Sequence, residues 1–424
     1  MAALQKSEAI RHIQLSYDNT DSQNSALQLI LALRPEWKAT QETITFVKFT
    51  DGITNQLFKA INKLPGLSEK QVDREAVLLR AYGKGTDVLI DREREALAHS
   101  LLARHNLAPS LLARFENGLL YKYVEGSVCS PADLRRPEVW RGVAKRLGEW
   151  HATLPISAIS SEPTPSLSNG HPTKPRNKRT ASLEAIEKLI PGKPVPNLWT
   201  VMQKWILALP STSQAEKTRC DTLQTELEWL VKTFGNVSGL DAKPFVFAHC
   251  DLLCGNVIIH PSSSASSSRS SSSACSDEVD LFVEVSFIDY EYATPAPAAF
   301  DLANHFAEWG GFDCDFNVLP TRSQRRDFLK AYLASYNSHT NRSFDSSESE
   351  QLFEEVDRFR GVPGFYWGIW ALIQAQISQI DFDYANYAEI RLGEFWAWKA
   401  EVEGKREKEG SKLPLRERRW AQEE

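Results

Sequence analysis

FAHCDLLCGNVIIH, residues 247–260, places three polar side chains inside an otherwise apolar stretch. They are His249, Asp251 and Asn256, and they follow the spacing H-x-D-x-x-x-x-N. The apolar residues on either side predict two short strands joined by a polar loop. A carboxylate in such surroundings needs a partner or a task, because an unpaired buried charge is costly. Loops held by rigid strands commonly carry catalytic residues, so we predict a catalytic loop here.

The bulk composition fits one large domain or two medium ones. The chain has 424 residues, of which 42% are hydrophobic, and a formal net charge of -6. This mild acidity gives no electrostatic footprint for nucleic acid or for an anionic membrane. The first residues lack the apolar core of a signal peptide, and no apolar run is long enough to span a membrane. We expect a soluble, cytoplasmic protein without membrane insertion and without a nucleic-acid partner.

The six cysteines do not indicate a disulfide framework in a chain of this length. Cys250 and Cys254 lie near His249 and His260, but their spacing matches no zinc motif and their flanks resemble strands. We therefore expect reduced thiols, no zinc site, and no catalytic role for either cysteine.

The N-terminal third predicts a small sheet with one helix. Residues 1–40 are mainly polar and are expected to form an extension. Residues 41–125 alternate short apolar runs with turn signals and form the predicted nucleotide-binding lobe. A helix is expected in DREREALAHSLLARHNL. Its predicted apolar face consists of Ala96, Leu97, Leu101 and Leu102. SLLARFENGLLYKYV predicts a hairpin that closes at residues 116–118.

Helical patterns dominate residues 126–402, where we expect the catalytic and substrate-binding lobe. The segments 156–181 and 261–277 are rich in serine, proline or both, and are predicted to be disordered insertions. The second segment separates the predicted strands NVIIH and DLFVEVSFIDYEYA, so we interpret it as an enlarged hairpin turn. Residues 403–424 form a charge run with little apolar content and predict a disordered tail.

A second carboxylate, Asp289, follows the apolar strand in FIDYEYA. An H-x-D-x-x-x-x-N loop followed by such an aspartate is typical of kinase-like phosphotransferases. There the loop aspartate accepts the proton of the substrate hydroxyl, and hard oxygen ligands hold Mg²⁺ at the phosphates. We predict Asp251 as the base, Asn256 and Asp289 as metal ligands, and His249 as a catalytic-loop residue that shapes the loop.

Nucleotide-binding residues are expected upstream. TDGITNQLFK, residues 50–59, predicts a turn whose backbone N–H groups could contact phosphates, although its single glycine leaves an ordinary hairpin as the alternative. The candidates in this turn are Asp51, Gly52, Thr54 and Asn55. Arg80, late in the strand AVLLRAYG, takes the place of the phosphate-binding lysine of protein kinases, and Glu95 could pair with it. A surface ion pair is the alternative for these two residues.

As a set, these motifs resemble the choline/ethanolamine kinases, and within that family the ethanolamine branch. The resemblance covers roughly residues 45–400 and rests on DGITNQLFK, VLLRAYG, LIDRERE, HNLAPSLLARFENGLLYKYVEG, HCDLLCGNVI, FIDYEYA, FDLANHF and FYWGIWALIQAQIS. It implies ATP- and Mg²⁺-dependent phosphorylation of an amino alcohol, the first step toward phosphatidylethanolamine. The expected fold is α+β, two-lobed and protein-kinase-like, with a small β-rich N-terminal lobe, a larger mainly helical C-terminal lobe, and ATP between them.

The resemblance also implies substrate-binding residues. Glu291, Asp301 and Glu308 fall on acidic positions of the family's second motif, and LLC at 252–254 is similar to the ethanolamine branch. The chain departs from the family's pattern in three places. The loop reads His-Cys-Asp where the family often has His-Asn-Asp, ATPAPAAF lacks tyrosines that are common there, and the serine-rich insertion is extra. The missing tyrosines leave the pocket wall less defined.

Aromatic residues near the C-terminus are predicted to contact the amine. Trp367 and Trp370 share one helix face, and Tyr384 and Tyr387 follow. An aromatic cage favours quaternary ammonium, whereas a primary ammonium wants acceptors such as Glu308. Core packing is the alternative for these aromatic residues. Residue types alone leave choline and ethanolamine open, and the preference for ethanolamine comes from the resemblance.

Two other functions stay open at this stage. A related kinase-like enzyme acting on an aminoglycoside or a sugar would share the catalytic loop but would lack WGIWALIQAQ as a cation pocket. A non-catalytic nucleotide-binding scaffold would normally have lost Asp251, Asn256 or Asp289, and all three are present. The sequence also leaves the oligomeric state open, a homodimer included.

Overall fold

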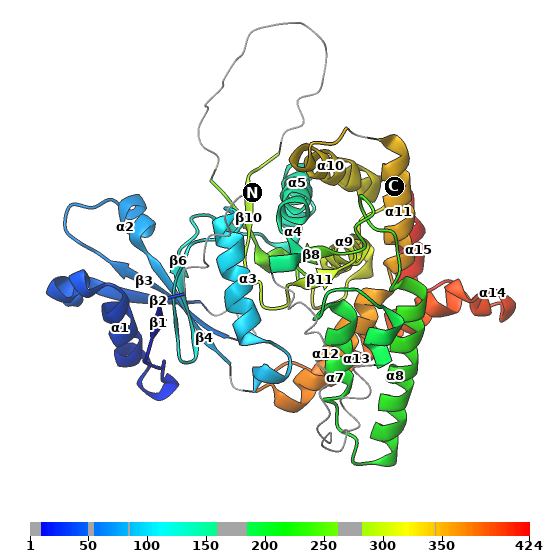
Figure 1. The fold of residues 1–424 in the computed structure, drawn as a ribbon, viewed down its shortest axis with the longest axis horizontal. Helices are drawn as coiled ribbons and strands as arrows, with labels where there is room; N and C mark the ends of the chain where they lie inside the picture. The colour runs from blue at the N-terminus through cyan, green and yellow to red at the C-terminus, as the bar shows by residue number, and fades with distance from the viewer. Residues whose placement is uncertain (1–9, 50–54, 84, 159–184, 262–281, 344) are drawn as a thin grey trace, which may run out of the picture. The chain divides into compact units, whose positions relative to one another are not determined.

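The computed structural model describes residues 10–49, 55–83, 85–158, 185–261, 282–343 and 345–424 (Figure 1). The predicted nucleotide-binding residues Asp51, Gly52 and Thr54 lie outside these ranges. The chain divides into two compact units, with the boundary between Gly126 and Ser127. The first unit is built on a sheet and the second is mainly helical, which confirms the predicted α+β class.

The first unit contains one six-stranded sheet in the order β1–β5–β6–β4–β3–β2. Its strands are β1 (His12–Ile13), β2 (Ile44–Phe49), β3 (Asn55–Asn62), β4 (Val77–Tyr82), β5 (Leu111–Phe115) and β6 (Gly118–Lys122). Neighbouring strands are antiparallel except β1 and β5, which are parallel. The predicted hairpin is confirmed, because Phe115 pairs with Gly118 across its turn.

Residues that precede the predicted lobe contribute to the core of this unit. β1 extends the sheet, and α1 (Ser22–Leu33) buries Leu29 and Ile30 in the same apolar cluster as Phe58 and Leu79 of the sheet. The segment therefore completes a core rather than extending from it. The other helices of the unit are η1 (Asn19–Asp21), η2 (Pro35–Thr43), α2 (Glu69–Glu75), η3 (Thr86–Val88) and α3 (Arg92–Arg104).

The helix α3 lies where it was predicted, but one residue that was predicted on its apolar face is not buried. Leu97 is 37% exposed, whereas the other three predicted residues are buried. The buried stripe runs through Glu95, His99 and Leu102, which are four and three residues apart. The prediction for Leu97 is wrong because polar residues occupy that stripe and a count of apolar residues alone missed them.

Two small sheets of the second unit flank the catalytic loop, one in the order β10–β9–β7 and the other β11–β8. Their strands are β7 (Ser127–Val128), β8 (Val246–Ala248), β9 (Val257–Ile259), β10 (Val285–Phe287) and β11 (Thr294–Ala296). β9 and β10 pair antiparallel, as predicted for the hairpin strands. The serine tract between them falls mostly in residues 262–281, outside the described ranges. β8 pairs with β11 rather than β9, so the catalytic loop crosses between the two sheets.

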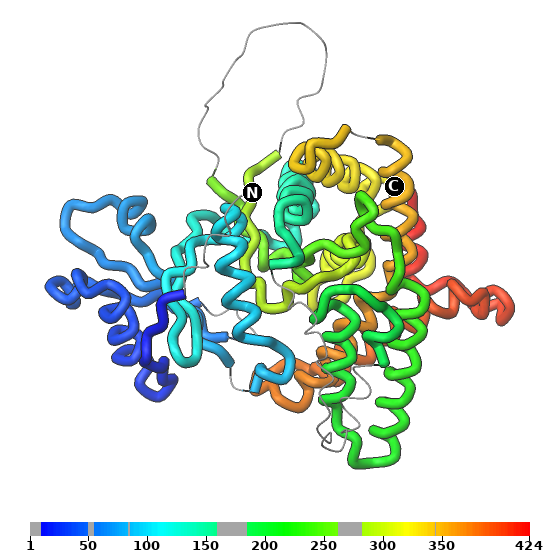
Figure 2. The backbone as a smooth tube through the Cα atoms, in the orientation of Figure 1, coloured from blue at the N-terminus to red at the C-terminus, as the bar shows by residue number. Residues whose placement is uncertain are grey.

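Helices make up most of the second unit. The longer ones are α5 (Pro137–Thr153), α7 (Leu198–Ile206), α8 (Gln214–Phe234), α9 (Ala298–Ala307), α10 (Arg322–Thr340), α11 (Ser346–Phe359), α12 (Val362–Ile377) and α13 (Tyr384–Val402). The short ones are η4 (Ile156–Ala158), α4 (Pro131–Leu134), η5 (Cys254–Asn256), η6 (Glu308–Gly310), η7 (Phe316–Val318), α14 (Lys405–Lys408) and α15 (Leu415–Ala421). α5 packs along α10, and α12 along α13 (Figure 2).

Glycine allows α12 and α13 to approach closely. A Cβ atom on Gly364 would lie 2.5 Å from the backbone oxygen of Arg391, closer than any real side chain tolerates. Arg391 is thereby held against α12, the helix that carries the predicted amine-binding tryptophans. Among the described residues, no helix combines the length and apolarity needed to cross a membrane.

The C-terminal charge run folds, so the prediction of a disordered tail is wrong. α15 buries Arg416, Glu417 and Trp420. The indole N–H of Trp420 donates to Asp357 at 2.8 Å, and Arg416 pairs with Glu394 of α13 at 2.9 Å. Charged composition predicts solvation only when the charges find no partners. Here partners from distant helices neutralise them.

Candidate active site

The loop between β8 and β9 is held by two side chains of α9. Asp301 accepts backbone hydrogen bonds from His249, at 2.9 Å, and from Cys250, at 2.7 Å. Asn304 donates to the backbone oxygen of Cys250 at 3.0 Å. Cys250 has a φ of +63°, a left-handed conformation that is costly for a non-glycine residue. The bonds from α9 stabilise this turn and so set the position of Asp251.

Asp301 is wholly buried and also contacts α5. Nε2 of His151 lies 3.0 Å from Oδ2 of Asp301, and the other ring nitrogen lies 2.7 Å from the Tyr332 hydroxyl. Burial opposes ionisation of Asp301, yet its interactions with His151 and His249 lower the pKa of the carboxyl below its ordinary value. Both oxygens are therefore engaged by the protein, and Asp301 anchors the loop.

His249 is buried with both ring nitrogens engaged. Nδ1 accepts the backbone N–H of Asp251 at 3.3 Å, and Nε2 lies 3.1 Å from the backbone oxygen of Ile288. This pattern assigns the ring proton to Nε2. Burial lowers the pKa of His249 to about 4, so the ring is neutral at pH 7. Neither nitrogen is left for proton transfer to a substrate.

Asp251 and Asn256 face each other within the loop. Nδ2 of Asn256 donates to the backbone oxygen of Asp251 at 2.8 Å and to its Oδ2 at 3.0 Å. In the described ranges, Oδ1 of Asn256 accepts no hydrogen bond. Nδ2 of Asn256 thus binds Asp251, and Oδ1 stays available for a cation.

Carboxylates gather around Asp251. Burial raises the pKa of Asp251 well above its ordinary value, and the charges of Asp289, Glu308 and Glu291 add to the rise. The hydrogen bond from Asn256 opposes it. The structure therefore brings the three predicted acids to one place with the predicted base. A raised pKa makes a carboxylate a better acceptor for a hydroxyl proton near neutral pH.

Asp289 follows β10 and is placed by the hairpin with β9. The backbone N–H of Ile288 donates to the backbone oxygen of Asn256 at 3.0 Å, which holds the two predicted metal ligands in register. Asp289 itself has a φ of +64°. In the part of the chain that the structure describes, no three His, Cys, Asp or Glu side chains are grouped to hold a metal ion. Mg²⁺ does not need such a group, because it commonly takes one or two carboxylates together with phosphate oxygens.

Glu308, immediately after α9, forms a buried ion pair with Arg391 of α13. Oε1 of Glu308 lies 3.1 Å from a guanidinium nitrogen, and the two side chains are 6% and 1% exposed. Burial raises the pKa of Glu308, and the charge of Arg391 opposes that rise. Within the described residues, Oε2 of Glu308 has no hydrogen-bond partner. One oxygen of a buried carboxylate near Asp251 is thus left for a ligand.

Aromatic side chains adjoin these acids. Trp367 and Trp370 pack edge to face with ring centres 5.4 Å apart, which confirms that they share a helix face. Tyr384 packs on Trp370 at 5.7 Å. The indole N–H of Trp370 donates to the hydroxyl of Tyr292 at 2.8 Å. Trp367, Trp370 and Tyr384 therefore form a connected cluster, and all four predicted aromatic residues are buried.

Tyr387, the fourth predicted aromatic residue, contacts different groups. Its ring lies 5.7 Å from the guanidinium of Arg391, and it packs against Phe312 and Phe382. Phe312 and Phe382 are 36% and 38% exposed. Tyr387 thus stands between the Glu308–Arg391 ion pair and two aromatic side chains at the surface.

Two residues of this arrangement, Tyr292 and Arg391, were not predicted. Burial and the charges of Glu291 and Asp251 raise the pKa of Tyr292 well above its ordinary value, so its hydroxyl stays protonated while it accepts the indole N–H of Trp370. Its signal in the sequence was the position three residues after Asp289. Arg391 lies one helical turn after Tyr387, but its partner Glu308 is too distant in sequence for a local pattern to reveal.

In the first unit, Arg80 of β4 pairs with Glu95 of α3. The nearest atoms are 3.3 Å apart, and the side chains are 8% and 2% exposed, which excludes a surface ion pair. Arg92 also contacts Glu95, at 3.0 Å. Asn55 begins β3 and pairs with Tyr82, two residues beyond Arg80. The predicted pairing of Arg80 with Glu95 is confirmed.

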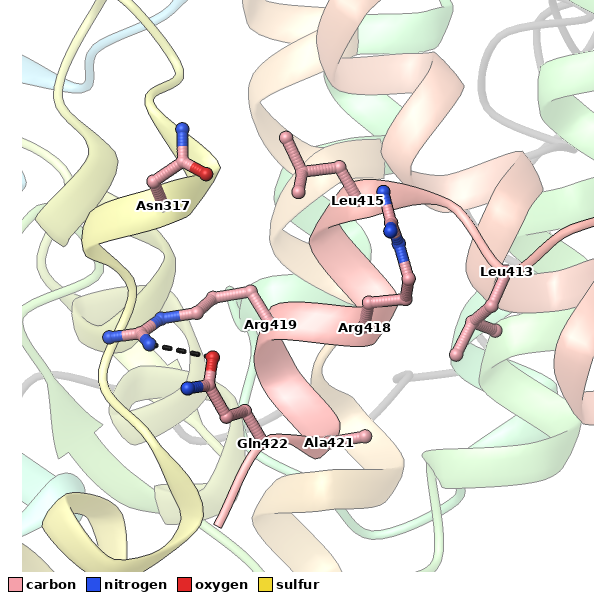
Figure 3. Close-up of a pocket in the computed structure, with 7 residues that line it drawn as sticks. All are labelled: Asn317, Leu413, Leu415, Arg418, Arg419, Ala421 and Gln422. Atoms are coloured by element: carbon pink, nitrogen blue, oxygen red, sulfur yellow. Dashed lines mark hydrogen bonds between the residues drawn. The ribbon is translucent and has the colours of Figure 1, made fainter. Parts of the chain in front are cut away.

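A pocket beside α15 does not involve the predicted site. This pocket has a volume of about 460 Å³ (Figure 3). It is lined by Asn317, Leu413, Leu415, Arg418, Arg419, Ala421 and Gln422. A hydrogen bond of 2.8 Å joins Arg419 to Gln422 within it. The pocket marks the outer face of α15, whereas the residues buried by α15 are on its opposite face.

Comparisons with known proteins agree with this geometry. The family model described as choline/ethanolamine kinase matches residues 46–396. Human ethanolamine kinase 2 is 32% identical over 398 residues, covering 94% of this chain and 86% of the relative. The ethanolamine kinase of Drosophila melanogaster is 32% identical over 411 residues, covering 84% of this chain and 69% of the relative.

Solved structures agree as well. The ethanolamine kinase of Plasmodium vivax matches with a TM-score of 0.61 and 25% identity over 88% of both chains. The choline kinase of Cryptosporidium parvum shares the fold, with a TM-score of 0.58 and 18% identity over 90% of this chain and 96% of the other. The predicted protein-kinase-like fold is thereby confirmed. With its family match, its relatives and its catalytic loop, the chain belongs to the choline/ethanolamine kinase family.

Proposed function

We propose that the protein transfers the γ-phosphoryl group of ATP to the hydroxyl group of ethanolamine, giving phosphoethanolamine and ADP. The observation that carries the proposal is the buried Asp251, whose pKa is raised by burial and by Asp289, Glu308 and Glu291. The ethanolamine kinases of human and fruit fly, each 32% identical to this chain, support ethanolamine as the acceptor. The product is the first intermediate on the route to phosphatidylethanolamine.

The transfer is direct. Asp251 accepts the proton of the substrate hydroxyl while the hydroxyl oxygen bonds to the γ-phosphorus and the bond to the bridging oxygen of ADP breaks. His249 does not act as a nucleophile, because one ring nitrogen accepts the Asp251 N–H and the other faces the oxygen of Ile288. No phosphorylated enzyme is therefore expected on the path.

Asn256 and Asp289 are suited to hold Mg²⁺. Oδ1 of Asn256 is an oxygen donor without a hydrogen-bond partner in the described residues, and Asp289 supplies a carboxylate in register with it. This set of hard oxygen donors fits Mg²⁺, whose remaining ligands are commonly water and phosphate oxygens. When bound, the ion neutralises charge on the phosphate oxygens.

The first unit supplies nucleotide contacts. Arg80 binds phosphate oxygens, and Glu95 holds its guanidinium in place from α3 at 3.3 Å. Asn55, at the start of β3, contributes to phosphate binding together with Asp51, Gly52 and Thr54, which lie outside the described residues. The buried position of the Arg80–Glu95 pair supports this role, because a buried pair holds the guanidinium in a fixed position, whereas an exposed pair is mobile and weak.

The amine is bound by acids and aromatic rings of the second unit. Oε2 of Glu308 accepts a hydrogen bond from the ammonium, and Glu291 adds negative charge nearby. The faces of Trp367 and Trp370, with Tyr384 and Tyr387, line the methylene groups. Asp301 is a positioning residue rather than an amine ligand, because its oxygens bind the backbone of the catalytic loop and His151.

Choline is the second candidate acceptor, and the Trp367–Trp370 pair favours it through cation–π attraction to a quaternary ammonium. A direct competition separates the two. Purified protein, ATP and Mg²⁺ are offered ethanolamine and choline at equal concentration, and both phosphorylated products are quantified. Excess phosphoethanolamine supports the proposal. Excess phosphocholine assigns the site to choline, and the absence of both products refutes the proposed activity.

A further inference from the structure

Six charged side chains form a buried row that leads from Asp251's neighbours to α15. In order they are Glu308, Arg391, Glu394, Arg416, Glu417 and Arg360. The successive distances are 3.1, 3.4, 2.9, 3.1 and 2.9 Å. The first five side chains are at most 6% exposed, and Arg360 is 18% exposed. Because the charges alternate in sign, each inner member lies between two opposite charges.

Arg391 is shared between two carboxylates. One of its terminal nitrogens contacts Glu308, and its Nε contacts Glu394 at 3.4 Å. A buried carboxylate needs full compensation of its charge. Arg416 of α15 supplies the second partner of Glu394, at 2.9 Å. With that partner in place, Arg391 need not satisfy Glu394 alone and can stay in contact with Glu308.

We propose that Arg391, Glu394 and Arg416 are positioning residues for the amine, and that α15 is thereby a working part of the substrate site although it touches no substrate. Arg416 and Glu394 hold Arg391 against Oε1 of Glu308, and this contact aims Oε2 at the ammonium and favours the ionised carboxyl. The inference deepens the proposed function and rests on its assignment of Glu308 as the ammonium acceptor.

The surroundings of Glu308 make this contact decisive. The groups that face it are Arg391, Glu394 and Tyr387 of α13, Asp251 and Cys254 of the catalytic loop, and Cys314 of the loop after η6. Within the described residues, the cation in this set is Arg391, and the others are acids, a phenol or thiols. Drawing Arg391 away therefore favours the protonated form of Glu308. A protonated carboxyl cannot form an ion pair with an ammonium.

The kinetic test compares two arginines of α15. Arg416→Met removes the buried partner of Glu394, and Arg418→Met removes an exposed arginine two residues later. We expect Arg416→Met to raise KM for ethanolamine by about 10–100-fold, the loss of one charge-assisted hydrogen bond, with KM for ATP unchanged. Arg418→Met is expected to match the wild type. The double variant Glu394→Gln/Arg416→Met removes the competing charge as well, so its KM should return toward the wild-type value.

A second readout does not depend on turnover. The side-chain carboxyl of Glu308 is followed by carbon NMR during a pH titration of the full chain, with Glu308→Gln for assignment. Arg416→Met should move the titration midpoint of Glu308 upward by about one unit, and the double variant should restore it. If the wild type does not phosphorylate ethanolamine, the proposed function fails, yet this titration still decides whether α15 controls Glu308.

The proposal is overturned if folded Arg416→Met keeps both the wild-type KM and the wild-type midpoint, or if the double variant is no better than the single one. Should Arg416→Met fail to fold, Glu394→Gln alone tests the same link in the opposite direction. It leaves Arg391 to Glu308 only, so the midpoint should fall below that of the wild type. An unchanged midpoint in Glu394→Gln would contradict the proposal.

Discussion

Trp367 donates its indole N–H to the side-chain oxygen of Asn304 at 2.8 Å. Asn304 in turn donates to the backbone oxygen of Cys250, next to Asp251. One hydrogen-bonded path therefore joins the helix proposed to face the amine to the loop that carries the proposed base. Trp367 and Asn304 are both buried, so breaking their bond leaves a polar group without a partner in apolar surroundings.

Trp367→Phe is expected to lower the free energy of unfolding by about 1–3 kcal/mol, the cost of leaving the Asn304 oxygen unsatisfied. It should also lower kcat, because the catalytic loop loses part of its support. Denaturant unfolding and steady-state kinetics check both effects. Trp396→Phe is the matched control, since Trp396 is 38% exposed. Equal stability of the two variants would show that the Trp367 bond carries no weight.

Asp251→Asn should lower kcat by roughly 10²–10⁴-fold, the usual contribution of a positioned general base. The Asn side chain keeps the shape and can still accept the bond from Asn256, so the affinity for ATP should change little. Rapid-quench measurement of phosphoethanolamine formation and ATP binding by calorimetry test the two statements. A rate like that of the wild type would remove Asp251 from the role of base.

The same substitution should stabilise the protein at neutral pH. Because the pKa of Asp251 is raised in the folded state, the native protein binds this proton more tightly than the unfolded chain does. The stability it contributes is therefore present at low pH and is lost as the pH rises through the folded-state pKa. Asn does not titrate, so Tm of Asp251→Asn minus Tm of the wild type should grow with pH. A difference that shrinks with pH would contradict the assignment.

His249 should stay neutral throughout the physiological range. Its pKa is lowered to about 4 by burial, so its ring signals in proton NMR should not move between about pH 5.5 and pH 8. Titration of His249 near pH 6.5 would show that the loop opens to water.

Glu95→Gln is expected to raise KM for ATP by about tenfold, because Arg80 loses a charge-assisted partner. KM for ethanolamine should stay as in the wild type. Glu93→Gln is the control on the same helix, since the Glu93 side chain is 84% exposed and pairs with Arg114. If both variants bind ATP like the wild type, Arg80 does not depend on Glu95 for its position.

Deletion of residues 262–273 should leave kcat and both KM values near those of the wild type. The strands on either side of the insertion pair through Ile259 and Val285 next to it, and the pairing that places Asn256 and Asp289 lies at the opposite end of these strands, at Val257 and Phe287. A shorter turn costs little entropy to close. Loss of folded protein on deletion would mean that the tract contributes to packing.

The catalytic loop could be predicted from sequence because its evidence is local. His249, Asp251 and Asn256 lie within eight residues of one another, and the flanking strands are short and apolar. The pairing of Arg80 with Glu95 was predictable for a related reason, since a strand and the next helix carry it. Both predictions used residues that lie close together in the sequence.

The environment of the amine could not be predicted in the same way. Glu308 and Arg391 are 83 residues apart, and their contact depends on the packing of α13 beside α12. The charges of α15 indicated solvation because composition does not reveal partners on other helices. Asp301 was predicted as a substrate residue because its type and position fit, whereas its partners in the structure are the backbone N–H groups of His249 and Cys250.

The buried row of ion pairs has alternating charges and ends, at the substrate site, with the carboxylate of Glu308. Its six members sum to zero, and the last one presents an anion to the interior of the site. A primary ammonium bound to Oε2 adds one more opposite charge to the row. A neutral alcohol would leave the Glu308 carboxylate without a charged partner, and an anionic substrate would be repelled by it. Glu308 therefore selects the charge of the substrate, whereas the aromatic rings select the size of its amine group. Among the six side chains of this row, Arg360 is the most exposed, so dissolved ions screen chiefly that end. The preference for a cationic substrate should therefore depend little on ionic strength.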